Sequence, residues 1–92
     1  MIICVAVLAL AASSEAAGAA CYADYKAKRD NPLKLHYGVM QISGKCTKGA
    51  ARAQAAQRLN ARGWILLNVL SVFDESGLEK RKASAGQYFL RF

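Results

Sequence analysis

The chain has 92 residues and a formal net charge of +7, with 13 Lys and Arg against six Asp and Glu. A chain of this length holds one small domain at most, which excludes a multidomain enzyme. Hydrophobic residues make up 54% of the chain, far more than a disordered, highly charged polypeptide contains. Composition therefore predicts one small globular domain with a basic surface.

The first twenty residues predict an export signal. An apolar run over Ile2–Ala12 is followed by Ser13–Glu15 and then by small residues over Ala16–Ala20. The run spans about 18 Å as a helix, well short of the ~30 Å hydrocarbon core of a membrane. Signal peptidases require small side chains before the cut. We expect residues 1–20 to be a cleaved signal peptide, cut after Ala19 or Ala20, and residues 21–92 to be a single domain in the periplasm or outside the cell.

Two features of this leader leave alternatives open. No Lys or Arg precedes Ile2, so we expect the true start codon to lie upstream and Met1 to be internal. Cleavage before Cys21 is also compatible with a lipoprotein, although Gly18 stands where a lipoprotein signal has an aliphatic residue. All 13 basic residues follow residue 20, and five of the six acidic ones remain once Glu15 is removed, so the exported chain carries +8.

The cysteines predict one structural disulfide. Cys4 leaves with the leader, so Cys21 and Cys46 are the two cysteines of the exported chain. Two cysteines in a small exported domain are typical of a disulfide. Closing a loop of about 25 residues stabilises the fold by roughly 3.5 kcal/mol on the chain-entropy estimate.

The first half of the exported chain predicts two helical turns followed by a strand. Residues 21–31 are polar and place Tyr22 and Tyr25 three apart, as on one side of a helix, which Pro32 ends. Residues 33–42 alternate as a half-buried strand does, with Leu33, Leu35, Tyr37 and Val39 on one face. A bulge near Gly38 would explain the shifted phase of the apolar residues that follow.

The second half predicts a helix, a buried strand, a short helix and a closing strand. Thr47–Arg62 begins with a capping Thr and ends at Gly63, as helices do. Trp64–Phe73 is apolar on both faces and should be covered on both. A short helix over Leu78–Ala85 and a strand over Gln87–Phe92 complete the order. We therefore predict an α+β fold, β-α-β-(short α)-β, in which a small three-stranded sheet carries one main helix on one face.

One segment resembles a known kind of domain. Leu59–Leu67, with its Gly-Trp-Ile-Leu entry into a strand at Trp64, is similar to small bacterial β-α-β-β domains of unknown function, which close with a strand resembling Tyr88–Arg91. The exported chain, through Cys21–Lys26 and Leu35–Val39, also resembles small exported proteobacterial proteins of unknown function. These resemblances imply a compact α+β fold and carry no catalytic residues to this chain.

The residues offer no pattern that predicts a catalytic, cofactor or metal site. His36 is the single histidine, and without a patterned carboxylate or hydroxyl beside it we expect a surface residue of a strand. Two cysteines 25 apart exclude a C-x-x-C redox motif or a zinc site. We therefore predict a protein that is not an enzyme and that uses no cofactor.

Three function classes follow from these observations. The first is an exported, disulfide-bonded accessory or interaction domain, whose partner is another protein or a second copy of itself. The second is a protein that binds polyanions or the envelope surface through its charge, weakly and without sequence-specific nucleic-acid recognition. The third is a small hydrolase, for which one histidine and five carboxylates supply little.

The buried strand also predicts where two copies would meet. If Ile65, Leu67 and Val69 pack on the main helix, the residues on the opposite side of the sheet face outward. An exposed apolar patch of that size usually marks a contact site. The predicted homodimer interface consists of Leu66, Leu70, Val72 and Phe89.

Overall fold

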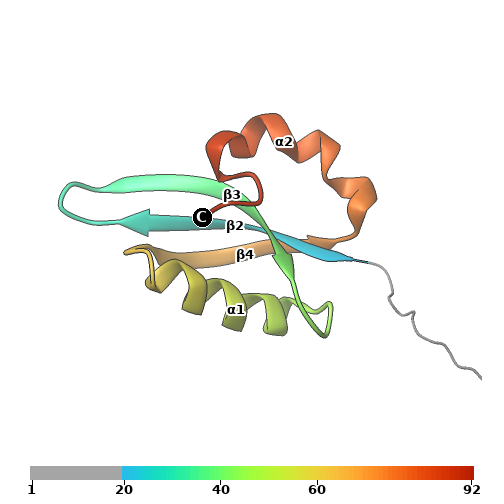
Figure 1. The fold of residues 1–92 in the computed structure, drawn as a ribbon. Coiled ribbons are helices and arrows are strands. Elements are labelled where there is room, and N and C mark those ends of the chain that lie inside the picture. The colour runs from blue at the N-terminus through green and yellow to red at the C-terminus, as the bar shows by residue number, and fades with distance from the viewer. Residues whose placement is uncertain (1–19) are drawn as a thin grey trace, which may run out of the picture.

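The computed structural model describes residues 20–92, so the expected export signal lies outside the described residues. Figure 1 shows a three-stranded sheet with a helix on each side. The strands are β2 (Cys21–Arg29), β3 (Lys34–Ile42) and β4 (Ile65–Phe73). The helices are α1 (Lys48–Asn60) and α2 (Glu79–Ala85), and two 3-10 turns, η1 (Glu75–Gly77) and η2 (Gly86–Tyr88), flank α2.

The α+β class, the small three-stranded sheet, the main helix and the disulfide are confirmed, but the order of the elements is different. The sheet has the order β3-β2-β4, with both pairs antiparallel. The prediction of helical turns over residues 21–31 was wrong, because this segment is the central strand. Among residues 20–92, no helix is long and apolar enough to cross a membrane.

The burial of β2 explains why this polar segment forms a strand. Cys21, Ala23, Tyr25 and Ala27 alternate along it and pack into the core beneath α1. The small side chains of Cys21, Ala23 and Ala27 let the helix lie close to the sheet. Tyr22 points to the other face, where it joins a second cluster beneath α2.

Strand β3 pairs with β2 through nine consecutive residue pairs, without a bulge. The predicted bulge near Gly38 is therefore wrong, and the two apolar phases of the sequence are simply two covered faces. Met40 and Ile42 belong to the α1 side, whereas Val39 and Tyr37 belong to the α2 side. Gly38 is required by close approach, because a Cβ at this position would overlap the ring and hydroxyl of Tyr25.

Strand β4 contains the irregularities instead. Its register with β2 shifts twice, and each shift leaves one β4 residue without a partner in β2: Leu70 at the first and Leu67 at the second. The residues that reach the α1 core are therefore three apart, at Leu66, Val69 and Val72. A strand that is apolar on both faces has no alternation to fix its register, so bulges could not be predicted from it.

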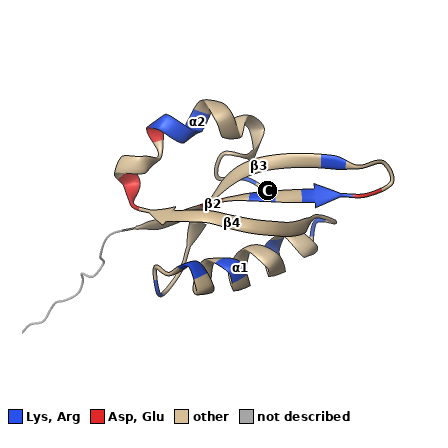
Figure 2. Cartoon of the chain, turned by 180° about the vertical axis from the view of Figure 1, so that it is seen from behind, with Lys and Arg blue, Asp and Glu red and all other residues tan. Residues whose placement is uncertain are grey.

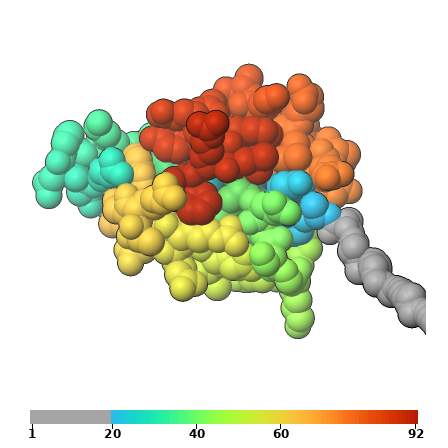
Figure 3. Space-filling view, viewed as in Figure 1, coloured from blue at the N-terminus to red at the C-terminus, as the bar shows by residue number. Residues whose placement is uncertain are grey.

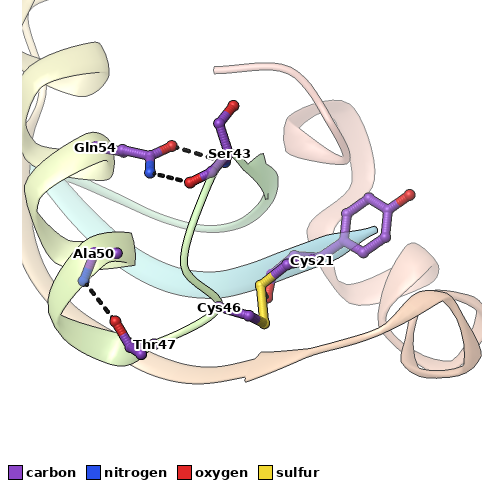
Figure 4. Close-up of a disulfide and its surroundings, with 7 residues drawn as sticks. Cys21, Ser43, Cys46, Thr47, Ala50 and Gln54 are labelled. Carbon is purple, nitrogen blue, oxygen red and sulfur yellow. Dashed lines mark hydrogen bonds between the residues drawn. A yellow bond between two sulfur atoms is a disulfide. The ribbon is translucent and has the colours of Figure 1, made fainter. Parts of the chain in front are cut away.

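Helix α1 closes one face of the sheet and is fixed at its start. The Thr47 side chain accepts a hydrogen bond of 3.1 Å from the Ala50 backbone, which confirms the predicted cap. Figure 4 shows the confirmed Cys21–Cys46 disulfide, which joins the start of β2 to the segment before α1. In the same view the Gln54 amide bonds both backbone groups of Ser43, at 3.0 and 2.7 Å. The loop before α1 is thus held at three points.

The segment after α2 does not form the predicted third strand. Gly86–Tyr88 is a 3-10 turn, and beyond it Phe89 makes one parallel bridge to Val39 of β3. The Leu90 backbone N–H donates to the Val39 carbonyl at 2.8 Å. Tyr88 packs against the α1-side core and Phe89 against the α2-side cluster, so the C-terminal segment lies across the outer edge of β3. The third strand of the sheet is instead β2, which lies between β3 and β4.

Candidate functional site

The outer edge of β4 borders a groove. One wall is the first half of β4, and the other is the exposed side of α1. The helix contributes Ala53 and Ala56, whose short side chains leave the space beside the strand open, with Arg52 toward one end and Asn60 toward the other. Because α1 and β4 run antiparallel around the turn at Gly63, Arg52 lies at the Val69 end of the groove (Figure 1).

The edge itself is apolar and uncharged. All nine residues of β4 lack charge, and none is proline. Within residues 20–92, no segment pairs with its outer side. Ile65 and Leu67 are 48% and 50% exposed, and Leu70 is 36% exposed. Such an edge is a ready template for another extended chain, because its backbone donors and acceptors are unpaired and no charge repels a neighbour.

The predicted dimer interface is not one surface. Leu66 and Val72 pack against the α1-side core, whereas Phe89 packs against the cluster on the other side of the sheet. Leu70 lies at the first bulge and remains partly exposed. The assumption that Ile65 and Leu67 pack on the main helix was also wrong. The two bulges change which side each residue faces, so the four residues are not brought together.

His36 is buried among aromatic side chains, which corrects the prediction of a surface position. Its Nε2 forms a 2.9 Å hydrogen bond with the Tyr25 hydroxyl. The imidazole stacks on the Tyr88 ring with 3.7 Å between centroids and meets the Trp64 ring edge-on at 4.3 Å. The Arg29 guanidinium covers the outer side of Trp64 at 4.1 Å. The alternation along β3 predicted that His36 and Leu35 point to different faces of the strand. The structure shows that the face with His36 is the covered one.

Burial lowers the pKa of His36 below its ordinary value, and the nearby positive charge of Arg29 lowers it further. The imidazole is therefore neutral at neutral pH. Its Nδ1 is buried and has no hydrogen-bond partner among the described residues. Burial, and next the neighbouring Tyr88, raise the pKa of Tyr25, so its hydroxyl stays protonated. His36 and Tyr25 are thus two neutral groups that share one hydrogen bond among aromatic rings.

A second polar cluster lies on the opposite side of β2. Asp24 is buried there and accepts hydrogen bonds from Ser71 at 2.7 Å, Tyr37 at 2.8 Å and Arg81 at 3.0 Å. Burial alone would raise the pKa of Asp24, but these three hydrogen bonds and the Arg81 charge lower it below the usual value. Burial and the bond to Asp24 raise the pKa of Tyr37 to about 12. The cluster joins α2 to β2, β3 and β4, so its evident role is structural.

Basic residues are spread over β2, β3, α1 and α2 rather than gathered in one block, as the blue segments of Figure 2 show. No group of three or more His, Cys, Asp or Glu side chains within residues 20–92 gathers to hold a metal ion. No protein-family model, curated protein or solved structure matches this chain. The resemblance of the Trp64 region to small bacterial domains therefore stays a prediction.

Sequence reasoning did not find the groove beside β4. The covered position of His36 and the two bulges depend on pairing between segments distant in sequence. One signal was available, because Ile65–Phe73 is a long strand without a single charge, and sheet edges normally carry charges or proline. The absence of charge indicated a strand that is covered on both faces, whereas Ile65, Leu67 and Leu70 are exposed in the structure.

Proposed function

We propose that this chain is a small, exported, non-enzymatic interaction domain that binds an extended segment of a partner protein along β4. The observation that carries the proposal is the uncharged outer edge of β4 beside a groove that α1 keeps open. In strand addition, backbone hydrogen bonds supply affinity, and pockets for alternate side chains supply specificity. Here the backbone groups of the β4 edge would supply the hydrogen bonds, and the α1 wall of the groove would supply the side-chain pockets.

The groove also indicates the chemistry of the bound segment. Apolar side chains on one side of that segment would pack against Ala53 and Ala56 of α1. Arg52 at the Val69 end favours an acidic side chain or a terminal carboxylate at that end of the partner. The expected ligand is therefore an extended apolar segment with one negative group, lying antiparallel or parallel to β4.

Two further observations support an exported interaction domain. The Cys21–Cys46 disulfide is compatible with an oxidising compartment, and its formation occupies the sulfur that a lipoprotein would modify. A hydrolase that used His36 as its base would need this imidazole within reach of a substrate, but it lies among Tyr88 and Trp64 and bonds Tyr25. The first observation supports export, and the second argues against catalysis at His36.

A second copy of the chain is the competing occupant of this edge. An antiparallel β4 pair centred on Val69 would place Ile65 opposite Phe73 and Leu66 opposite Val72, although Leu67 would then face Ser71. Each copy would, however, bring its own α1, with Arg52 beside the groove, to the same side of the joined sheet. Like charges facing one another across an interface are unfavourable, so a partner segment of different sequence fits the edge better.

The test is a selection from a displayed library of random peptides, about ten residues long to match a strand, against the full chain. Trp64 is the single tryptophan and lines the groove, so its fluorescence emission reports binding of each selected peptide. Leu70→Lys places a charge on the edge at a residue that β2 does not pair, and it should weaken binding about tenfold or more. Arg52→Gln should weaken only peptides that carry an acidic group.

The matched control is Leu33→Lys, which adds the same charge at an exposed leucine in the turn between β2 and β3. This variant should bind the selected peptides as the original chain does. A library that yields no binder, or binders that Leu70→Lys leaves unaffected, would overturn the proposal. Light scattering that shows dimers of the original chain and monomers of Leu70→Lys would replace the partner segment with a second copy.

A further inference from the structure

Helix α2 covers only part of its side of the sheet. It packs over Tyr22, Val39 and Phe73, near the end of β2 where the chain enters the sheet. The opposite end, where β2 and β3 join in a hairpin, projects beyond both helices, as the teal region of Figure 3 shows. The α2 side of this hairpin is therefore uncovered sheet.

The uncovered end carries the two most exposed leucines of residues 20–92. Leu33 in the turn is 63% exposed, and Leu35 at the start of β3 is 66% exposed. A shallow hollow beside Leu35 is lined by Lys26, Tyr37 and Leu67. Transfer of such exposed apolar side chains from water into an apolar environment lowers the free energy of the system.

Lysines surround these leucines. Lys26 and Lys28 lie on β2 opposite Tyr37 and Leu35, and Lys34 begins β3. The one acidic group of the turn, Asp30, lies 3.5 Å from the Lys28 ammonium and offsets part of its charge. The region therefore combines an apolar tip with a net positive charge, which is the composition of a surface that lies on anionic lipid.

We propose that this hairpin tip, formed by Lys26, Lys28, Leu33, Lys34 and Leu35, docks on an anionic lipid bilayer. The leucines enter the boundary between headgroups and acyl chains, and the lysine ammonium groups lie at the level of the lipid phosphates. A projecting tip meets a flat surface without obstruction from α1 or α2 (Figure 3). The groove beside β4 lies on the α1 side, so this surface and the proposed peptide site share only Leu67, which lines both hollows.

Charge and shape favour lipid over two other occupants. The hairpin tips of two copies of the chain would bring six lysines together, so the charge opposes self-association through this patch. Nucleic acid would use stacking aromatic side chains, but the exposed side chains of this tip are leucines, and Tyr37 is half-buried and bonded to Asp24. An anionic bilayer offers an apolar environment for the leucines and phosphate groups for the lysines.

The experiment measures how the full chain partitions between water and vesicles of two compositions. One vesicle is phosphatidylcholine alone, and the other contains about 30% phosphatidylglycerol, which gives a negative surface potential. Residues 1–20 contain no Lys or Arg and carry Glu15, so they add no preference for the anionic vesicle. The ratio of the two partition coefficients therefore reports the basic surface of the domain.

The original chain should prefer the anionic vesicle by about tenfold or more, because each lysine near the surface contributes roughly a fivefold factor. The triple variant Lys26→Gln, Lys28→Gln, Lys34→Gln should lose most of that preference. The matched control Lys45→Gln, Lys48→Gln, Lys80→Gln removes the same charge from exposed positions elsewhere, and should keep the preference within about twofold.

A second pair of variants tests the apolar tip. Leu33→Ser with Leu35→Ser should weaken binding to the anionic vesicle about tenfold, whereas Leu90→Ser, at another exposed leucine, should leave it unchanged. Equal losses in the two lysine triples would show that general charge is responsible and would overturn the proposal. Equal binding to both vesicles by the original chain, or full binding by the double leucine variant, would overturn it as well.

Discussion

The two outer edges of the sheet differ in how they are closed. The edge of β3 is covered by the C-terminal segment, through the bridge between Val39 and Phe89 and the bond from the Leu90 N–H to the Val39 carbonyl. The edge of β4 has no such cover within residues 20–92, although it is the more apolar strand. A small protein that covers one edge with its own chain and leaves the more apolar edge open has that edge available for a partner.

The difference between the edges also concerns where buried polar groups lie. The covered edge contains His36, whose hydrogen bond with Tyr25 and stacking on Tyr88 join β2, β3 and the C-terminal segment. Strand β4 contributes only Ser71 to the buried polar contacts, through its bond to Asp24. Polar contacts therefore fix the covered edge, whereas β4 is held mainly by backbone pairing and by apolar contacts with α1. Substitutions should affect the two edges very differently.

The largest effect is expected from Gly38→Ala on the covered side. A methyl group at this position overlaps the Tyr25 ring, so the ring must leave β3 and lose its bond to His36. Overpacking and the broken bond together should lower the free energy of unfolding by about 3 kcal/mol. Urea denaturation measures this change. Gly49→Ala is the matched control, because its added methyl meets open space at the start of α1, and it should be neutral or stabilising.

Arg81→Met should have the next largest effect. The substitution keeps apolar volume beside Phe73 but leaves the buried Asp24 carboxylate without its cation, which lies 3.0 Å away. We expect a loss of about 2 kcal/mol, because Ser71 and Tyr37 still donate to the carboxylate. Lys80→Met, at an exposed neighbouring position, should change stability by less than about 0.5 kcal/mol. Similar losses in the two variants would contradict a structural role for this ion pair.

The same carboxylate sets a pH dependence. Because the pKa of Asp24 is lower in the folded chain than its ordinary 3.8, the stability that it contributes is fully present above that value. That stability is lost as the pH falls through the lowered pKa. In Arg81→Met the pKa of Asp24 should rise, so acid unfolding should begin at a higher pH. Circular dichroism during acid titration of the two chains measures the shift.

His36 should give a smaller effect at milder pH. Its pKa is lower in the folded chain than the ordinary 6.5, so the unfolded chain binds more protons once the pH falls below about 6.5. Stability should therefore decrease on acidification from neutral pH, and the covered edge should loosen first. His36→Gln removes the titration while its amide is able to bond Tyr25, so its stability should be flat over the same range. If the stability of His36→Gln depends on pH as strongly as that of the original chain, the dependence does not come from His36.

The smallest effect on stability is expected at the open edge. Leu70→Lys changes a partly exposed residue that β2 does not pair, so the free energy of unfolding should change by less than about 0.5 kcal/mol. Val69→Lys, at the neighbouring buried and paired position, should by contrast be strongly destabilising. Thermal unfolding of the two variants measures the contrast. A severe loss in Leu70→Lys would mean that this residue belongs to the core.

Local signals in the sequence were sufficient for part of this fold. Thr47 before an Ala-rich run and Gly63 after it located α1, and the cysteine count located the disulfide. The central strand was missed because three of the four residues that alternate along its buried face, Cys21, Ala23 and Ala27, are small, and alanine favours helix. It became a strand because α1 requires small side chains beneath it, which is a tertiary requirement.

The candidate site was less accessible to prediction for a related reason. The sequence predicted a closing strand at residues 87–92 and no strand at residues 21–31, so it did not show which strand lies at the edge of the sheet. The structure instead places β2 between β3 and β4 and uses the C-terminal residues on the β3 edge. Which strand lies at an edge depends on the whole pairing order, and a single segment does not carry that information.

The most direct test of the open edge is backbone amide hydrogen exchange, followed by NMR, with and without a peptide selected on the full chain. In the free chain, the outward-facing amides of β4 should exchange quickly, whereas the Leu90 amide, which bonds β3, should exchange slowly. Added peptide should protect alternate amides of Ile65–Phe73 and leave those of β3 unchanged. Protection confined to β3 or to the helices, with no change along β4, would contradict strand addition at this edge.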